Sequence, residues 1–124
     1  MAITISTNLN LGTTHFETDD LDSTAQQIKE GTSTLFSFEI DNSDNEDPCY
    51  VKAWNTNAAA APSVGTTVPN LALKVAGGKV RRHVVNGGKG QTWATGIFVA
   101  CVTTPGTAGS AAPTNAVGVK IWTS

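Results

Sequence analysis

The sequence predicts an all-β fold: a single antiparallel β-sandwich, jelly-roll or immunoglobulin-like, with little or no helix. Twelve glycines and five prolines, together with many threonines and alanines, favour strands and turns. Segments in which apolar and polar residues alternate recur between turn residues along the chain. The 124 residues form one domain, which is long enough to bury roughly two-thirds of its unfolded surface.

The first 31 residues hold one expected strand and one ambiguous segment. Residues 3–11 alternate around Ile3 and Ile5 and predict a strand. Residues 22–31 begin with a potential helix N-cap and end at Gly31, so they form either a short helix or a short strand. Within a single domain of residues 1–124, residues 1–31 could be an extended N-terminal arm or an edge segment.

Six further strands are expected after residue 33, the segment 79–88 among them. Segment 34–41 has one apolar face, made by Phe36, Phe38 and Ile40. Segments 49–55, 70–78 and 116–123 also alternate, and their expected inward residues are Cys49, Val51, Ala53, Leu71, Leu73, Val75, Val117, Val119 and Ile121. Segment 92–104 is apolar on both faces, which is typical of a central strand covered on each side.

The segment 79–88 directly follows 70–78, which ends in a Gly-Gly turn, so these two runs are expected to form a hairpin. His83 alternates with Lys79 and Arg81, which favours an exposed strand face for all three. Two loops of low complexity, 55–69 and 104–115, are expected at the ends of the sandwich, where they could lie on a neighbouring molecule.

The charge is divided along the chain. All ten acidic residues lie between Glu17 and Asp47, with Lys29 as their only neighbouring cation, whereas residues 49–124 carry seven cations and no acid. The first part therefore carries −9 and the second +7, which gives the net −2. Three explanations compete: charges that offset within one folded molecule, head-to-tail association, or nucleic-acid binding. The scattered cations make nucleic acid the weakest of the three.

No catalytic constellation is present in the sequence. The acidic run 41–48 offers Asp41, Ser43 and Asn45 as alternate oxygen ligands for calcium, but it lacks the glycine and the final glutamate of an EF-hand loop. A solvated turn is therefore favoured. His15 and His83 are too few for a zinc site. No serine lies in a nucleophile motif, and no Gly-rich run has phosphate-loop spacing. No cofactor is expected.

Cys49 and Cys101 are the only cysteines, and both fall in expected strands. Two buried reduced thiols are favoured over a disulfide formed after release into an oxidising medium. The first residues lack the basic and apolar regions of a signal peptide, and no apolar run approaches the length of a membrane span. We expect synthesis in the cytosol and no membrane partner.

The second half of the chain resembles a pattern found in small virion structural proteins of tailed bacteriophages. Its residues are Pro62, Val64, Gly65, Thr66, Pro69 and Leu71, followed by Trp93, Thr95, Gly96 and Ile97. The similarity covers roughly Cys49 to Trp122. The basic segment 79–90 is richer in cations than the pattern, and the acidic N-terminal part has no counterpart in it.

The resemblance implies a non-enzymatic β-sandwich of the virion, most simply a capsid decoration (cement) protein that binds the major capsid protein as a homo-oligomer, with a trimer favoured. On this interpretation an acidic set contacts a basic set on another chain; together they are Asp41, Asp44, Glu46, Asp47, Lys79, Arg81 and Arg82. The alternative is a carbohydrate- or receptor-binding module that uses Trp54, Trp93 and Trp122 as a stacking platform.

Overall fold

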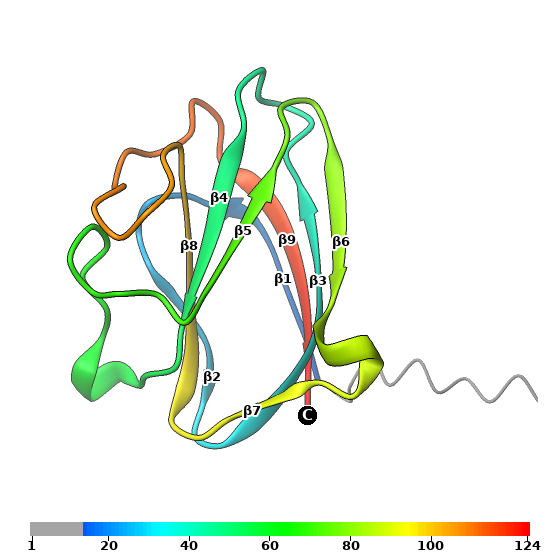
Figure 1. Ribbon diagram of the computed structural model, residues 1–124, viewed down its shortest axis with the longest axis vertical. Coiled ribbons are helices and arrows are strands. Elements are labelled where there is room, and N and C mark those ends of the chain that lie inside the picture. Colours follow the sequence, from blue (N-terminus) through cyan, green and yellow to red (C-terminus); the bar gives the residue numbers. More distant parts are fainter. Residues whose placement is uncertain (1–13) are drawn as a thin grey trace, which may run out of the picture.

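The chain folds into two antiparallel sheets packed face to face, as seen in a computed structural model that describes residues 14–124 (Figure 1). The strands are β1 (Thr14–Leu21), β2 (Gln26–Glu30), β3 (Ser33–Asp41), β4 (Cys49–Trp54), β5 (Leu71–Val75), β6 (Val80–Val84), β7 (Gln91–Trp93), β8 (Gly96–Val102) and β9 (Val117–Thr123). Two single turns of 3-10 helix, η1 (Ala58–Ala60) and η2 (Val85–Gly88), lie in the connections. The predicted all-β sandwich is confirmed.

The strand order identifies the topology as a jelly roll. One sheet, here called sheet A, has the order β1-β9-β3-β6, with β7 paired to the start of β3. The other, sheet B, has the order β2-β8-β4-β5. Apart from the short β7, each strand is followed by one in the opposite sheet, except that β5 follows β4 within sheet B. Two four-stranded sheets connected in this way are the arrangement of an eight-stranded jelly roll, which excludes the immunoglobulin-like alternative.

The core lies between the two sheets and is made by every second residue of their strands. The inward residues expected of segments 49–55, 70–78 and 116–123 lie there, Leu71 at its margin, which confirms the alternation of those three strands. All seven residues of β8 are buried, as expected of a strand covered on both faces. This core makes the sandwich a single packed body.

The expected hairpin of segments 70–78 and 79–88 is wrong. β5 pairs with β4 in sheet B, whereas β6 pairs with β3 in sheet A, so the Gly77-Gly78 turn crosses from one sheet to the other. Gly77 packs directly on the backbone of Glu46, where a Cβ atom would overlap the carbonyl oxygen. Gly77 therefore serves a close approach between two turns, and Gly78 supplies the positive φ of the turn.

Two other expected strands are corrected in detail. Segment 92–104 is divided: β7 belongs to sheet A and β8 to sheet B, with the break before Gly96. In β3 a bulge between Leu35 and Ser37 shifts the register, so Leu35 joins Phe38 and Ile40 in the core. Phe36 lies outside that cluster. A bulge of this kind changes which face the residues before it occupy.

The N-terminal expectations have separate outcomes. The ambiguous segment 22–31 forms strand β2, which pairs with β8. β1 pairs with β9 along most of its length and is the edge strand of sheet A, so residues 14–31 are part of the sandwich rather than an arm. The strand expected at residues 3–11 lies outside the described residues.

The two low-complexity loops cover the outer face of sheet B instead of extending from the ends of the sandwich. Trp54, Phe98 and Ala100 point away from the main core and form a second buried cluster, against which Val64 of the first loop packs. Gly65 of the first loop lies against Ser110 of the second. Sheet B is therefore covered on both faces.

Candidate interaction surfaces

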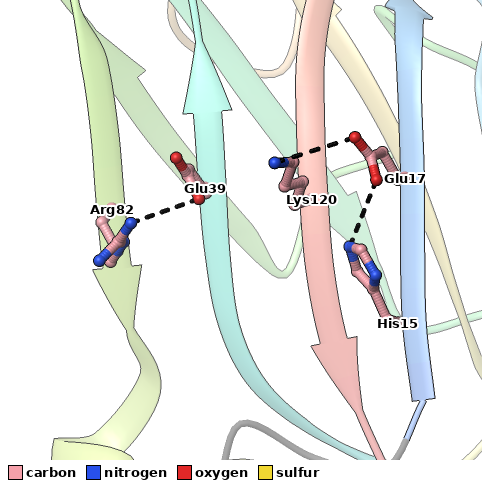
Figure 2. A network of polar contacts seen from close by, with 5 residues as sticks. All are labelled: His15, Glu17, Glu39, Arg82 and Lys120. Atoms are coloured by element: carbon pink, nitrogen blue, oxygen red, sulfur yellow. Dashed lines mark hydrogen bonds and ion pairs between the residues drawn. The ribbon is translucent and has the colours of Figure 1, made fainter.

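The outer face of sheet A carries a row of alternating charges. Glu17 of β1 is paired with Lys120 of β9, Lys120 with Glu39 of β3, and Glu39 with Arg82 of β6. Directly paired residues in neighbouring strands point to the same face. Read across the sheet, the charges are therefore negative, positive, negative, positive, and Figure 2 shows the four side chains side by side.

Ion pairs within this row link neighbouring strands. The Arg82 Nη2 atom lies 3.4 Å from Glu39 Oε2, and Lys120 Nζ lies 3.9 Å from Glu17 Oε1 (Figure 2). Glu17 also lies 3.8 Å from His15. Part of the opposing charge thus offsets within one molecule. Because all these side chains remain well exposed except that of Glu39, we expect each pair to contribute little to folding stability.

The residues on both sides of the charged row include apolar groups. The His15 imidazole stacks on the Trp122 indole, with ring centroids 5.0 Å apart and planes 7° apart. Val80 and Val84 of β6 belong to the same outer face and are 53% and 41% exposed. This face of sheet A therefore combines charges with apolar groups, and none of the described loops is seen to cover it in Figure 1.

The acidic run 41–48 is a turn built on two buried asparagines. The Asn42 amide donates to the carbonyl oxygens of Asp47 (3.0 Å), Val75 (3.3 Å) and Ala76 (3.2 Å), and its oxygen accepts from Asn45 at 2.9 Å. The Asn45 side chain also donates to the Asn115 carbonyl oxygen and accepts from the Asn115 backbone N–H, both at 2.8 Å. These amides connect three loops at one end of the sandwich.

This inward orientation removes Asn45 from the calcium hypothesis, since its side chain is committed to protein partners. The Asp41 carboxylate accepts from the backbone and the hydroxyl of Ser43, and these bonds hold the pKa of Asp41 below its usual value. Among residues 14–124 no group of three or more potential metal-ligating side chains comes together. The turn is held in place by hydrogen bonds of its own and neighbouring residues.

The acids of the expected interface, Asp41, Asp44, Glu46 and Asp47, are exposed. The last three border an open cleft of about 310 Å³ together with Pro48, Thr103, Pro113, Thr114 and residues of the asparagine network. Lys79 lies beside this turn, since its carbonyl oxygen accepts from the Asn42 backbone N–H, and its side chain is exposed. Acids and a cation of the expected interface therefore share one end of the same molecule.

The two arginines of the expected interface point in opposite directions. Arg82 lies on the outer face of sheet A, whereas Arg81 is paired with Ile40 and points to the inner side of the edge strand. From there Arg81 donates to the carbonyl oxygen of Lys74 in sheet B at 2.7 Å. Arg81 thus bridges the open edge between β6 and β5, and the two arginines do not lie on the same face of the strand.

His83 also differs from its expected place on an exposed face. It is paired with Phe38, a core residue, and is half-buried. Desolvation, with a smaller contribution from the Arg81 charge, lowers the pKa of His83. His83 therefore lies with Arg81 on the inner side of β6, at the edge of the sandwich.

Lys52 is the buried charge that the sequence did not single out. Its side chain lies on the outer face of β4 beneath the loop 104–115 and is 1% exposed. The ammonium group donates to the carbonyl oxygens of Gly106 at 2.6 Å and Gly109 at 2.7 Å. Desolvation lowers the pKa of Lys52. A lysine inside the covered face of a sheet thus fixes a loop that contains few apolar residues.

The three-tryptophan platform is not formed. Trp54 is 1% exposed and donates from its indole to the Thr67 carbonyl oxygen at 3.0 Å, and Trp93 is 2% exposed in the main core. Trp122 alone reaches the surface, where His15 stacks on it. Alternation in strands placed Trp54 and Trp122 outward correctly, but the loop over sheet B buries the first of them.

Both cysteines are buried as free thiols, which agrees with the favoured expectation. They belong to the main core on the neighbouring strands β4 and β8. A hydrogen bond with Cys49 and burial raise the pKa of Cys101. Neither thiol is poised as an accessible nucleophile, because reactive cysteines need a stabilised thiolate that a reagent can reach.

No helix of the described part of the chain is long and apolar enough to cross a membrane. Comparison with known proteins gives no match to a family model, a curated protein or a solved structure.

Proposed function

We propose that the chain is a non-enzymatic structural protein of a tailed-phage virion, and most simply a capsid decoration protein that stabilises the head by bridging coat subunits. The observation that carries this proposal is the position of the two long loops on the chain's own sheet. In this jelly roll both low-complexity loops cover the chain's own sheet B, fixed by Lys52 and the Trp54 cluster. The end of the second loop also borders the open cleft beside the acidic turn, through Pro113 and Thr114.

A block of this kind suits a mechanical role. Its described residues hold the two large sheets together through one continuous core, and the turns at one end are joined by the buried Asn42–Asn45 network. A bridging protein needs such rigidity, because ordering flexible residues at each contact would cost conformational entropy and weaken binding. Many weak contacts by many copies then sum through multivalency.

The fold supports the proposal by analogy, since jelly rolls recur in viral capsid proteins. The same fold occurs in lectins, so the analogy alone does not decide between the two functions. The buried positions of Trp54 and Trp93 count against a sugar-stacking platform. The resemblance of residues 49–122 to virion proteins favours the particle over a free binding module.

The exposed end with the acidic turn is the surface that we assign to the coat protein. Asp44, Glu46 and Asp47 and the nearby Lys79 lie there on turns held by buried hydrogen bonds. Exposed charges on rigid turns can set the register of a contact without a large cost of ordering. Charge reversal of Asp44, Glu46 and Asp47 together should therefore weaken attachment while leaving the fold intact.

The test is to locate the chain on particles. An antibody raised against the purified chain is applied, with immunogold, to particles purified by density gradient from the culture that produces it. A decoration protein gives gold over the whole head, and a head-tail or tail protein gives gold at one vertex or along the tail. If the chain is absent from the particle fraction, the proposal is wrong. A wall-glycan pull-down of the free chain would then support the binding-module alternative.

A further inference from the structure

We propose that the outer face of sheet A is a two-fold interface between two copies of this chain. The proposal rests on the order of charges across the sheet, Glu17, Lys120, Glu39 and Arg82, which is complementary to its own reverse. It goes beyond the virion role, and it does not depend on that role being correct.

The complementarity follows from the strand order. A second copy is laid face to face on sheet A, with a two-fold axis parallel to the strands and midway between β9 and β3. This axis reverses the order of the strands, but each residue keeps its position along the strand direction. Lys120 then faces the partner's Glu39, and Glu17 faces the partner's Arg82. By symmetry each contact occurs twice, so four pairs of opposite charge are formed.

The other in-plane two-fold axis is disfavoured by the same row. If the axis runs across the strands, each strand faces its own copy, and every charge of the row meets an identical charge. Like charges in direct opposition are destabilising. The row thus selects one relative orientation of the two copies, which is the usual effect of charge complementarity at an interface.

The neighbouring rows fit this orientation in part. Asp41 is paired with Gly118 across β3 and β9, so Asp41 of one copy faces the space left by the partner's Gly118. Trp122 faces the partner's Ser37, and His15 faces the partner's Val84. Asp19 lies beside Gly118 and faces the partner's Val80, where no cation is opposite it.

The size of the face indicates a weak dimer. Four strands about 4.8 Å apart and seven residues about 3.4 Å apart cover roughly 450 Å², or about 900 Å² for both copies together. This is below the ~1,200 Å² typical of stable complexes. The Glu17–Lys120 and Glu39–Arg82 pairs already partly satisfy the charges within each copy. We therefore expect reversible association that salt weakens.

The central pair gives the sharpest experiment. Sedimentation velocity follows the mass of the full chain, 12.8 kDa as a monomer, from about 0.02 to about 1 mM protein at low and high salt. We expect a shift toward the dimer mass at high concentration and low salt. Glu39→Lys or Lys120→Glu turns two attractions into two repulsions and should raise the dissociation constant roughly 30-fold or more.

The double variant Glu39→Lys/Lys120→Glu separates pairing from any local effect of the substitutions. Its row reads negative, negative, positive, positive, which is again complementary to its own reverse. The double variant should therefore recover the dimer that each single variant loses. Mixed one to one with the wild-type chain, it should not form heterodimers, because both central contacts then join like charges.

Two matched controls apply the same charge changes to sheet B. Lys74→Glu in β5 and Glu30→Lys in β2 alter exposed residues away from sheet A and should leave the dissociation constant unchanged. On sheet A itself, Asp19→Asn should tighten the dimer several-fold, because it removes an acid without a counter-charge. Circular dichroism melts verify that each variant is folded.

Three results would overturn the proposal: a monomer throughout the concentration range, a trimer in place of a dimer, or a dimer that Glu39→Lys and Lys120→Glu do not weaken. Equal weakening by the sheet B controls would have the same consequence. None of these results bears on the presence of the chain in particles, so failure of this proposal and failure of the virion role are distinguishable.

Discussion

Replacing Asn42 by leucine tests whether the acidic turn is held by buried hydrogen bonds. Leucine keeps the approximate volume but removes the amide that donates to the carbonyl oxygens of Asp47, Val75 and Ala76 and accepts from Asn45. Asn42 is 0% exposed, so water cannot replace the lost partners. The substitution should destabilise the fold.

The magnitude follows from the bonds lost. Two amide protons and one oxygen leave the network, and each buried partner left unsatisfied costs about 1–2 kcal/mol. The total is about 3–6 kcal/mol, a large share of the ~5–15 kcal/mol typical of a domain. At about 4 °C per kcal/mol for a chain of this length, the melting temperature should fall by about 12–24 °C.

Urea denaturation monitored by circular dichroism measures this loss. Asn57→Leu is the matched control, because the Asn57 side chain only caps η1 at the surface, 3.1 Å from the Ala59 amide; it should cost no more than ~1 kcal/mol. If the free energy of unfolding of Asn42→Leu lies within about 1 kcal/mol of the wild-type value, the network does not hold the turns together. The argument that this end is rigid enough to bind the coat protein would then fail.

Three further predictions concern Lys52, Gly77 and the tryptophans. Folding lowers the pKa of Lys52 by desolvation, so the unfolded chain binds this proton more tightly. The free energy of unfolding should therefore rise with pH between the lowered pKa and 10.5. From pH 7 to 10 the melting temperature of the wild type should rise relative to that of Lys52→Met, and a constant difference would contradict this. Gly77→Ala places a Cβ on the Glu46 backbone and should cost several times more in urea melts than Gly118→Ala, whose Cβ meets only side chains and a distant carbonyl within 4 Å; equal costs would refute the close approach of the two turns. Acrylamide should quench chiefly Trp122, so Trp122→Phe should remove most of the quenchable emission, whereas Trp93→Phe should leave it; the reverse would contradict the burial of Trp93.

Alternation along the sequence predicts which residues of β4, β5 and β9 face the core, because strand geometry is local. It does not predict which strands pair. The Gly77-Gly78 turn has the local appearance of a hairpin, but β5 and β6 belong to different sheets. Pairing depends on contacts between residues far apart in the chain, and a jelly roll has many of these.

The charged row illustrates the same limit. Glu17, Glu39 and Lys120 are ordinary surface residues of alternating strands when each strand is considered alone. Their arrangement appears only when β9 is placed between β1 and β3, which joins segments about 80 to 100 residues apart in sequence. Alternation in β4 predicts that Lys52 points away from the main core, as it does, but its burial depends on a loop more than 50 residues away in sequence.

The charge split along the sequence does have a partial explanation in the fold. Because β1 and β3 come from the acidic part and β9 and β6 from the basic part, sheet A interleaves the two signs. Asp44, Glu46 and Asp47 of the turn are not included in this interleaving and remain exposed at the end of the sandwich. The turn and the sheet are therefore distinct surfaces.

The most direct test of the structural role is the copy number of the chain in purified particles, measured by mass spectrometry with isotope-labelled peptides against the major coat protein. A decoration protein predicts a fixed ratio to the coat protein, with many copies per head, that survives repeated gradient purification. A chain that is absent, or whose ratio falls with every purification step, would contradict the account.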